Sequence, residues 1–213
     1  MIAVKDNVSG SIYGDIMNDS INEILERIRQ LEDRLEDEFE KSRAQYEVKL
    51  RGKIAWFADE VVARQRAFKI RYPQFFRRAR LLHILVAPVI YSMIIPIVLL
   101  DLWVTLYQQI CFRAYGIPFV KRSTFIVVDR HHLAYLNAIE KIHCVYCGYG
   151  NGVFSYAREV AGRTEQFWCP IKHAIRLRDP HHHYTKFVEY GDAEGYRGKL
   201  AEIRKDVQEC ESD

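Results

Sequence analysis

The sequence lacks most of the patterns that would assign a chain to a known type of enzyme. It has no Ser-His-Asp order typical of hydrolases, no phosphate-binding glycine loop and no His-Glu-x-x-His metal motif. It also has no internal repeat and no low-complexity tract. Residues 1–19 are polar and contain no apolar stretch, so we expect no signal peptide. These absences leave open whether the protein catalyses any reaction.

Charge and cysteine content are not extreme either. The 31 basic residues nearly balance the 28 acidic ones, so the net charge gives no general case for nucleic acid as a partner. Five cysteines are an odd number, which argues against a closed disulfide framework. With 49% hydrophobic and 28% charged residues, the chain is neither a disordered tail nor a bundle of membrane spans.

One long apolar run is the main clue to location. Residues 84–100 carry no charge, and as a helix they would be about 25 Å long, near the lower limit for a membrane span. A basic stretch with interleaved aromatic residues, 64–80, comes directly before it. Such a stretch suits anionic lipid headgroups as well as nucleic acid, and the adjacent apolar run favours lipid. The sequence therefore predicts a membrane segment over residues 81–112.

The topology of this segment has two solutions. Pro88 and Pro96 can bend it into a re-entrant hairpin, and basic residues flank it on both sides. A hairpin would keep both flanks in the cytoplasm, where thiols stay reduced, whereas a single span would place the later cysteines on the opposite side. We favour the hairpin and keep the single span as the alternative.

Ahead of the membrane segment, residues 20–80 are expected to form a helical arm, preceded by a flexible tail over 1–19. Ser20 and Glu23 have the spacing of a capping box, which predicts a helix start. The apolar residues Ile21, Ile24, Ile28, Leu31 and Leu35 then alternate spacings of three and four, and a looser helical period continues through Leu50 and Ile54. The arm either packs on its own chain or joins a second copy or another protein through a short coiled coil.

A cysteine-histidine set is the strongest chemical signal. Cys144 and Cys147 form a C-x2-C pair before a glycine-rich stretch, which predicts two thiolates on a tight turn. Cys169 precedes a proline at an expected helix start, and His173 would lie one turn later on the same face. The four residues match a tetrahedral zinc site within a unit over residues 113–190. An iron–sulfur cluster and a redox-active dithiol are the alternatives.

The rest of this unit has less distinct signals. The β-branched run 123–128 predicts a strand, and Asp129 a cap for a helix over 130–142. We expect a glycine-rich turn over 143–152, helices over 153–168 and 169–177, and a polar tail over 191–213 with a short amphipathic helix.

Two further groups of polar residues have ordinary explanations. Glu159, Arg163 and Gln166 share one helix face, which predicts ion pairing along the helix; they could also orient metal ligands or supply a carboxylate ligand. The histidines at 181–183 follow a proline without periodic spacing, so we expect a solvated loop.

The block over residues 144–174, with its CxxC pair and the run RTEQFWCPIKHA, resembles a family of small, membrane-associated bacterial hypothetical proteins. No activity is established for that family. The resemblance implies a bacterial source and little else. Together with the re-entrant anchor, a bacterial source predicts attachment to the inner membrane with the soluble parts facing the cytoplasm.

Taken as a whole, the sequence predicts a mainly α-helical protein anchored in a membrane. We expect a structural or interaction protein with one bound zinc ion, and keep a membrane-associated redox or electron-transfer protein as the alternative.

Overall fold

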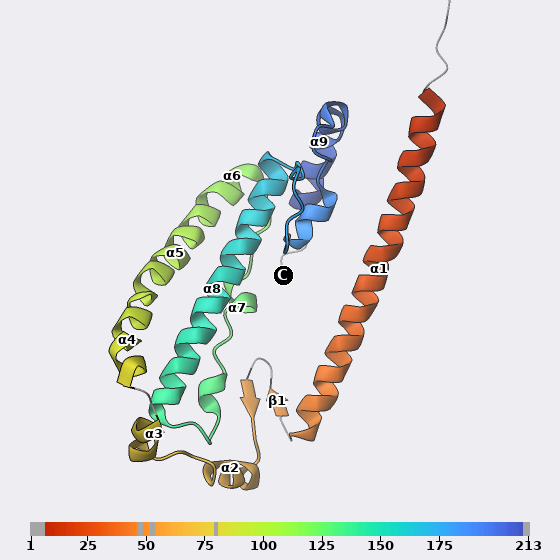
Figure 1. Cartoon of the computed structure of the whole chain (residues 1–213). Coiled ribbons are helices and arrows are strands. Elements are labelled where there is room, and N and C mark those ends of the chain that lie inside the picture. The colour runs from red at the N-terminus through yellow and green to blue at the C-terminus, as the bar shows by residue number, and fades with distance from the viewer. Residues whose placement is uncertain (1–6, 47–48, 52–53, 79–80, 211–213) are drawn as a thin grey trace, which may run out of the picture. The chain divides into compact units, whose positions relative to one another are not determined.

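The structure is a computed structural model that describes residues 7–46, 49–51, 54–78 and 81–210. The described chain is mainly α-helical, as the sequence predicted (Figure 1). It divides into two compact units, Met1–Ala63 and Arg64–Asp213. The basic, aromatic residues 64–80 therefore cluster with the second unit and not with the N-terminal helix.

The first unit consists of a long helix and a small hairpin. Helix α1 spans Asn7–Gln45, so the prediction of a flexible tail followed by a helix start at Ser20 was wrong for the described residues; residues 1–6 lie outside them. The predicted helical continuation was also wrong, because β1 (Lys49–Arg51) pairs antiparallel with β2 (Ile54–Trp56). Charged residues flank Leu50 on both sides, an alternation that suits a strand better than a helix. Helix α2 (Asp59–Arg66) then leads into the second unit.

The apolar run forms one long helical arc in the second unit, after the short helix α3 (Tyr72–Arg78). Its successive parts are α4 (Leu81–Ser92), α5 (Ile94–Tyr107), the π-helical turn η1 (Gln108–Phe112) and α6 (Arg113–Tyr115). Pro88 lies inside α4, and Pro96 lies in the first turn of α5, where a missing N–H costs little. The chain does not reverse at either proline, so the re-entrant hairpin is not formed. This helix is long and apolar enough to cross a membrane.

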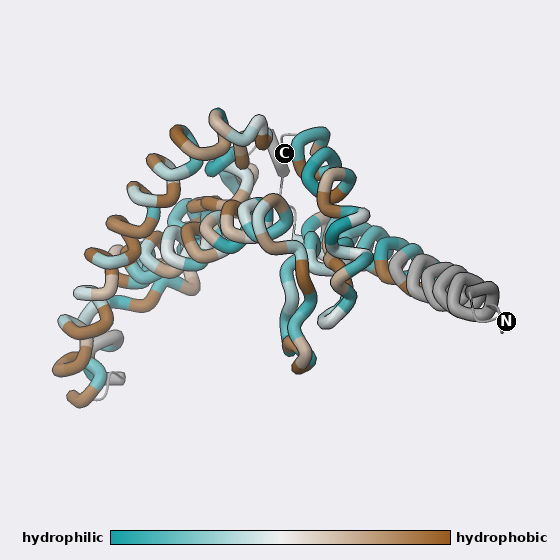
Figure 2. Tube along the Cα trace, turned by 90° about the horizontal axis from the view of Figure 1, so that it is seen from above, coloured by the Kyte–Doolittle hydropathy of each residue, from teal (hydrophilic) through white to brown (hydrophobic). Residues whose placement is uncertain are grey.

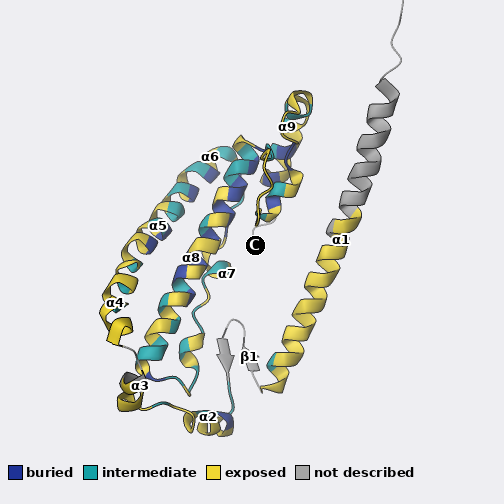
Figure 3. Cartoon of the chain, viewed as in Figure 1, coloured by how far each residue is buried: buried dark blue, intermediate teal, exposed yellow. Residues whose placement is uncertain are grey.

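Two polar residues of this helix, Asp101 and Gln108, are buried in the protein. Asp101 is buried and accepts hydrogen bonds from Arg122 Nε at 2.8 Å and from the Tyr149 hydroxyl at 2.8 Å. The buried amide of Gln108 bonds both backbone groups of Val120 and the hydroxyl of Tyr156. The remaining surface of α4 and α5 is mostly apolar and exposed (Figures 2 and 3). Over α5 and η1 the polarity is thus inverted, with Asp101 and Gln108 inside and large apolar side chains outside.

After the left-handed Gly116, the chain returns along the bundle as residues 117–133, called the return segment below. It contains α7 (Arg122–Phe125) and the 3₁₀ turn η2 (Arg130–His132). The strand predicted over 123–128 is not formed, because no neighbouring strand pairs with these residues in the described structure. The helix predicted from Arg130 starts only at Ala138, where Asn137 and Glu140 form a reciprocal capping box.

Helix α8 (Ala138–Trp168) runs without interruption through the glycines that predicted a turn. That prediction was wrong because these glycines serve packing. A Cβ atom at Gly152 would lie 2.7 Å from Ile126 Cα, and one at Gly148 would lie 3.2 Å from the Val127 carbonyl oxygen. The missing side chains let the return segment contact the helix backbone directly.

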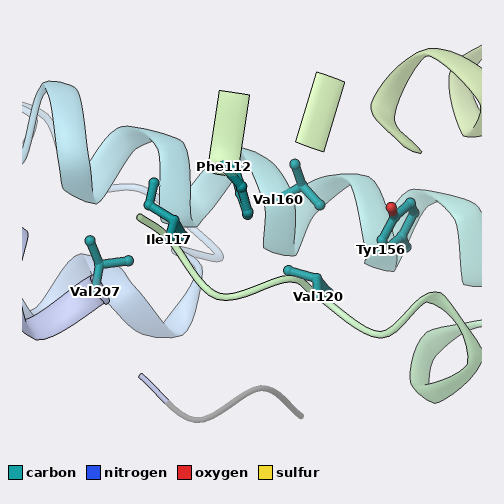
Figure 4. Close-up of a cluster of buried hydrophobic side chains, with 6 residues drawn as sticks. All are labelled: Phe112, Ile117, Val120, Tyr156, Val160 and Val207. Carbon is teal, nitrogen blue, oxygen red and sulfur yellow. The ribbon is translucent and has the colours of Figure 1, made fainter. Parts of the chain in front are cut away.

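Helix α8 lies parallel to α4 and α5. The Tyr146 hydroxyl bonds the Ile90 carbonyl oxygen, and the Tyr107 hydroxyl bonds Thr164 further along both helices. Six buried side chains form an apolar core that α8 shares with the end of the apolar helix, the return segment and the C-terminal region (Figure 4). They are Phe112, Ile117, Val120, Tyr156, Val160 and Val207.

The C-terminal region belongs to the same unit. The helix predicted after Cys169 is not formed; residues 169–181 are irregular and are held by a bridge between Ile171 and Val188. The short 3₁₀ helix η3 (His182–Lys186) follows. The predicted amphipathic helix near the C-terminus is confirmed as α9 (Ala193–Gln208), which buries Ile203 and Val207.

The close contact between Gly152 and the return segment can be tested by adding one methyl group. Gly152→Ala should lower the free energy of unfolding by about 1–3 kcal/mol, because the new methyl group meets backbone atoms that cannot move independently. The matched control is Gly198→Ala in α9, where nothing lies within 4 Å of the new Cβ, and a gain of about 0.5–1 kcal/mol is expected. Denaturant unfolding of the full chain in detergent measures both. Equal behaviour of the two variants would contradict the packing role.

Candidate functional site

The structure does not bring the four predicted zinc ligands together within one chain. Cys144 and Cys147 lie in the first third of α8, and Cys169 follows its last residue. At about 1.5 Å per residue, Cys147 and Cys169 are roughly 33 Å apart along the helix axis. His173 is exposed beyond them, with its ring stacked on Tyr184. All five cysteines are free thiols.

A different polar cluster lies in the second half of α8. Arg163 Nε donates to Glu159 Oε1 at 2.7 Å, and Arg163 Nη1 donates to the Pro118 carbonyl oxygen at 3.2 Å. The ion pair expected along this helix face is therefore confirmed. It is more than a surface contact, because the side chains of Arg163 and Glu159 are only 1% and 5% exposed. Gln166, the third member of that face, bonds the Ile203 carbonyl oxygen and Asp206.

The histidine triplet meets this ion pair from η3. His183 Nε2 lies 3.0 Å from Glu159 Oε1, and His182 Nδ1 lies 3.5 Å from Glu159 Oε2. The expected solvated loop is wrong for His183, which is 1% exposed, whereas His182 is exposed. Gly162 makes the burial feasible, because a Cβ there would lie 3.2 Å from a carbon of the His183 ring.

The first histidine of the triplet takes a separate acidic partner. His181 Nε2 lies 2.9 Å from Glu165 Oε2. The Nδ1 atoms of His181 and His183 are both buried and have no hydrogen-bond partner among the described residues. Protein groups in the described part of the chain thus leave the polar network of the triplet incomplete.

The electrostatics of the cluster favour an ionised carboxylate. Burial alone would raise the pKa of Glu159, but hydrogen bonds from His183 and Arg163 outweigh it and lower the pKa to about 2. Burial lowers the pKa of His182, and the nearby His183 lowers it further. At neutral pH the cluster therefore presents a carboxylate and a neutral imidazole side by side.

A pocket of about 280 Å³ opens beside Glu159 and His182. Ser155 and Arg158 of α8 line it, and Arg158 Nη2 forms an ion pair with Asp179 at 3.1 Å. This volume is close to the lower end of the range for small-molecule sites. The cluster thus lies at the wall of a cavity that water and small ligands can enter.

Sequence reasoning found the helix face but missed its burial. The signal was present, because Tyr156 and Val160 lie on the same side of α8 as Glu159 and Arg163, at spacings of three and four. Because the apolar pair and the charged pair share one helix face, the charged side chains are expected to be buried together with the apolar ones. Nothing local in the sequence indicated that His183 would reach them.

Comparisons with known proteins add no further constraint, because no family model, no curated protein and no solved structure matches this chain. The resemblance to a bacterial membrane-associated family stays a prediction. The site is therefore argued from the geometry of the chain itself.

The low pKa of Glu159 generates a prediction for stability against pH. A folded-state pKa of about 2, below the ordinary 4.5, means that the carboxylate contributes stability above about pH 4.5 and loses it as the pH falls towards 2. Glu159→Gln removes one charged partner of the buried Arg163 and should cost about 3–5 kcal/mol at neutral pH. The difference from wild type should shrink between pH 4.5 and 2.

Urea unfolding of the full chain in detergent, with a chelator present throughout, measures this difference at each pH. Glu202→Gln on the exposed surface of α9 is the control and should change stability by less than about 0.5 kcal/mol at any pH. A constant difference between wild type and Glu159→Gln across the pH range would contradict the assignment.

Proposed function

We propose that the chain is a membrane-anchored structural or interaction protein. Its second unit holds lipid through the outer face of α4 and α5, and α1 joins it to a second copy of the chain. The observation that carries this proposal is the inverted polarity of the apolar helix. Large side chains exposed on this face include Leu85, Val89, Leu99, Leu102, Trp103 and Leu106.

Lipid is the occupant that fits this face best. Burying each large apolar side chain contributes about 1.5–3 kcal/mol, so leaving the whole face in water would cost on the order of 10 kcal/mol or more. The exposed Arg71 and Arg77 lie just before α4, where they can meet anionic headgroups, and the exposed Tyr72 suits the interface. The resemblance to bacterial proteins supports the inner membrane as the site of attachment.

Attachment can be tested by fractionation. The chain should remain with membranes after washing with alkaline carbonate and with high salt, and detergent should release it, because apolar contact and not charge holds it. A variant with Leu99→Asp and Leu102→Asp on the exposed face should be released more readily. The matched control, Gln109→Asp and Arg113→Asp, alters exposed polar residues near the helix end and should stay bound. Wild-type protein found in the soluble fraction without detergent would refute the anchor.

Helix α1 supports the self-association part of the proposal. The apolar residues that alternate spacings of three and four on α1 are called the seam below. Four of them have exposed side chains: Ile24, Ile28, Leu31 and Leu35. The side chain of Ile21 lies outside the described residues. Taking Ile28 and Leu35 as a positions and Leu31 as a d position puts Arg27 at g and Glu32 at e, where side chains of a partner helix meet.

These flanking charges favour a parallel pair of helices. In a parallel dimer, Arg27 of one copy faces Glu32 of the other, and the same contact recurs by symmetry. In an antiparallel dimer, the g positions face each other and would bring Arg27 and Arg34 together. A parallel arrangement also suits two copies inserted in the same membrane.

Self-association through α1 can be tested by placing charged residues on the seam. Ile28→Asp with Leu31→Asp should shift the protein from dimer to monomer in detergent, measured by light scattering or sedimentation, without releasing it from membranes. Both side chains are exposed in the single chain, so its own fold should tolerate the change. The matched control is Gln30→Asp with Ala44→Asp, which adds the same charge to the opposite face and should leave the dimer intact. A dimer that survives the seam variant would place the interface elsewhere.

A redox function has less support. Reactive C-x2-C pairs with a low thiol pKa are typical of helix N-termini, where the helix dipole stabilises a thiolate. Cys144 and Cys147 lie two to three turns inside α8. The redox alternative therefore stays a prediction without geometric support.

A further inference from the structure

We infer that Glu159, His182 and His183 form a binding site for one zinc ion, with three protein ligands and an open fourth position. The inference goes beyond the structural role proposed above and does not depend on it. It also replaces the cysteine ligands with a different set, from α8 and η3. A carboxylate oxygen of Glu159 and one ring nitrogen of each histidine all lie within 4.8 Å of one another.

The spacing suits a tetrahedral ion. With zinc–nitrogen and zinc–oxygen bonds of about 2.0–2.2 Å, ligand atoms around one ion are about 3.4 Å apart. Glu159 Oε2 and His182 Nδ1 are already 3.5 Å apart. His183 Nε2 lies 3.0 Å from the other oxygen of the same carboxylate.

The surroundings hold the carboxylate in place. Arg163 occupies Oε1 of Glu159, which fixes the group and leaves Oε2 directed to His182. Hydrogen bonds of this kind to a metal ligand typically change metal affinity by 10–100-fold. Because Arg163 also offsets the charge of Glu159, we expect tighter binding for zinc than for magnesium or calcium, which prefer several anionic oxygens.

The two ring nitrogens of His183 have different surroundings. Nε2 contacts Glu159, whereas the buried Nδ1 has no hydrogen-bond partner among the described residues. When Nε2 binds a metal, the ring keeps its proton on Nδ1 and remains neutral. His183 is thus fixed beside the carboxylate by burial, with Glu159 as its one described polar contact.

Glu159 and His182 line the same pocket as Ser155 and Arg158, which gives an ion at this site access to solvent. Structural zinc sites are closed by four protein ligands, whereas sites with three ligands keep a position for water or a small molecule. The exposed His182 forms the outer edge of the cluster, so an ion can enter from the pocket. The proposal is therefore an exchangeable zinc ion and not a buried folding element.

Zinc titration of the full chain in detergent micelles, after removal of metal with a chelator, tests the site. A competing fluorescent chelator reports affinity, and wild type should bind one equivalent of Zn²⁺. His182→Ala should weaken binding at least about tenfold, and its exposed side chain makes it the ligand whose loss least affects folding. The matched control is His132→Ala, an exposed histidine in a similar 3₁₀ turn, which should bind as wild type does.

A second variant separates this site from the cysteine set. Cys144→Ser, Cys147→Ser and Cys169→Ser combined should keep the zinc affinity unchanged. Co²⁺ in place of zinc should give visible absorption without the intense thiolate charge-transfer band that cysteine ligands produce. The metal-free melting temperature of His182→Ala should equal that of wild type, and only wild type should gain stability on adding Zn²⁺.

Four results would overturn the inference. Absence of saturable Zn²⁺ binding in wild type would leave the cluster as a purely structural ion pair. Loss of the ion in the triple cysteine variant while His182→Ala keeps it, or a thiolate band with Co²⁺, would return the metal to the cysteines. Unaltered affinity in His182→Ala, with its fold intact, would exclude His182 as a ligand.

Discussion

The buried ion pair between Glu159 and Arg163 is the interaction on which the C-terminal half of the structure depends. Two charges removed from water cost several kcal/mol each, and close pairing with further hydrogen bonds is what offsets that cost. Arg163 reaches the carbonyl oxygen of Pro118 in the return segment, and Glu159 receives His183 from η3. Three segments distant in sequence are therefore fixed relative to one another by one salt bridge, which contributes specificity more than net stability.

A second constraint comes from the apolar helix. Its two buried polar residues are both satisfied inside the protein: Asp101 by Arg122 and Tyr149, Gln108 by Val120. An apolar solvent outside requires this arrangement, because an unpaired polar group facing hydrocarbon costs several kcal/mol. The same distribution that leaves the outer face of α5 exposed gives α8 its polar partners.

The sequence predicted features that depend on local patterns and missed those that depend on distant contacts. The helical class, the apolar segment, the C-terminal helix and the Glu159–Arg163 pair all follow from spacing along a single helix. The turn at Gly148 and Gly152 was wrong because glycine permits both a turn and close packing, and only the position of Ile126 decides between them. The cysteine site failed for the same reason, since its geometry assumed that turn.

The parallel course of α5 and α8 also bears on how the chain assembles. Two helices that run the same way cannot meet as a simple hairpin, and their polar contacts join residues 48 or more positions apart, as in the bonds of Tyr156 to Gln108 and Tyr149 to Asp101. The return segment meets the apolar helix after only 12 positions, through Val120 and Gln108 of η1. Loop closure therefore favours an order in which the apolar helix first collects the return segment, and α8 docks last on a surface already prepared for its glycines. Arg122 lies 21 positions after Asp101 and Tyr149 lies 48 positions after it. During synthesis Arg122 therefore becomes available first and can pair with this carboxylate before Tyr149 is made.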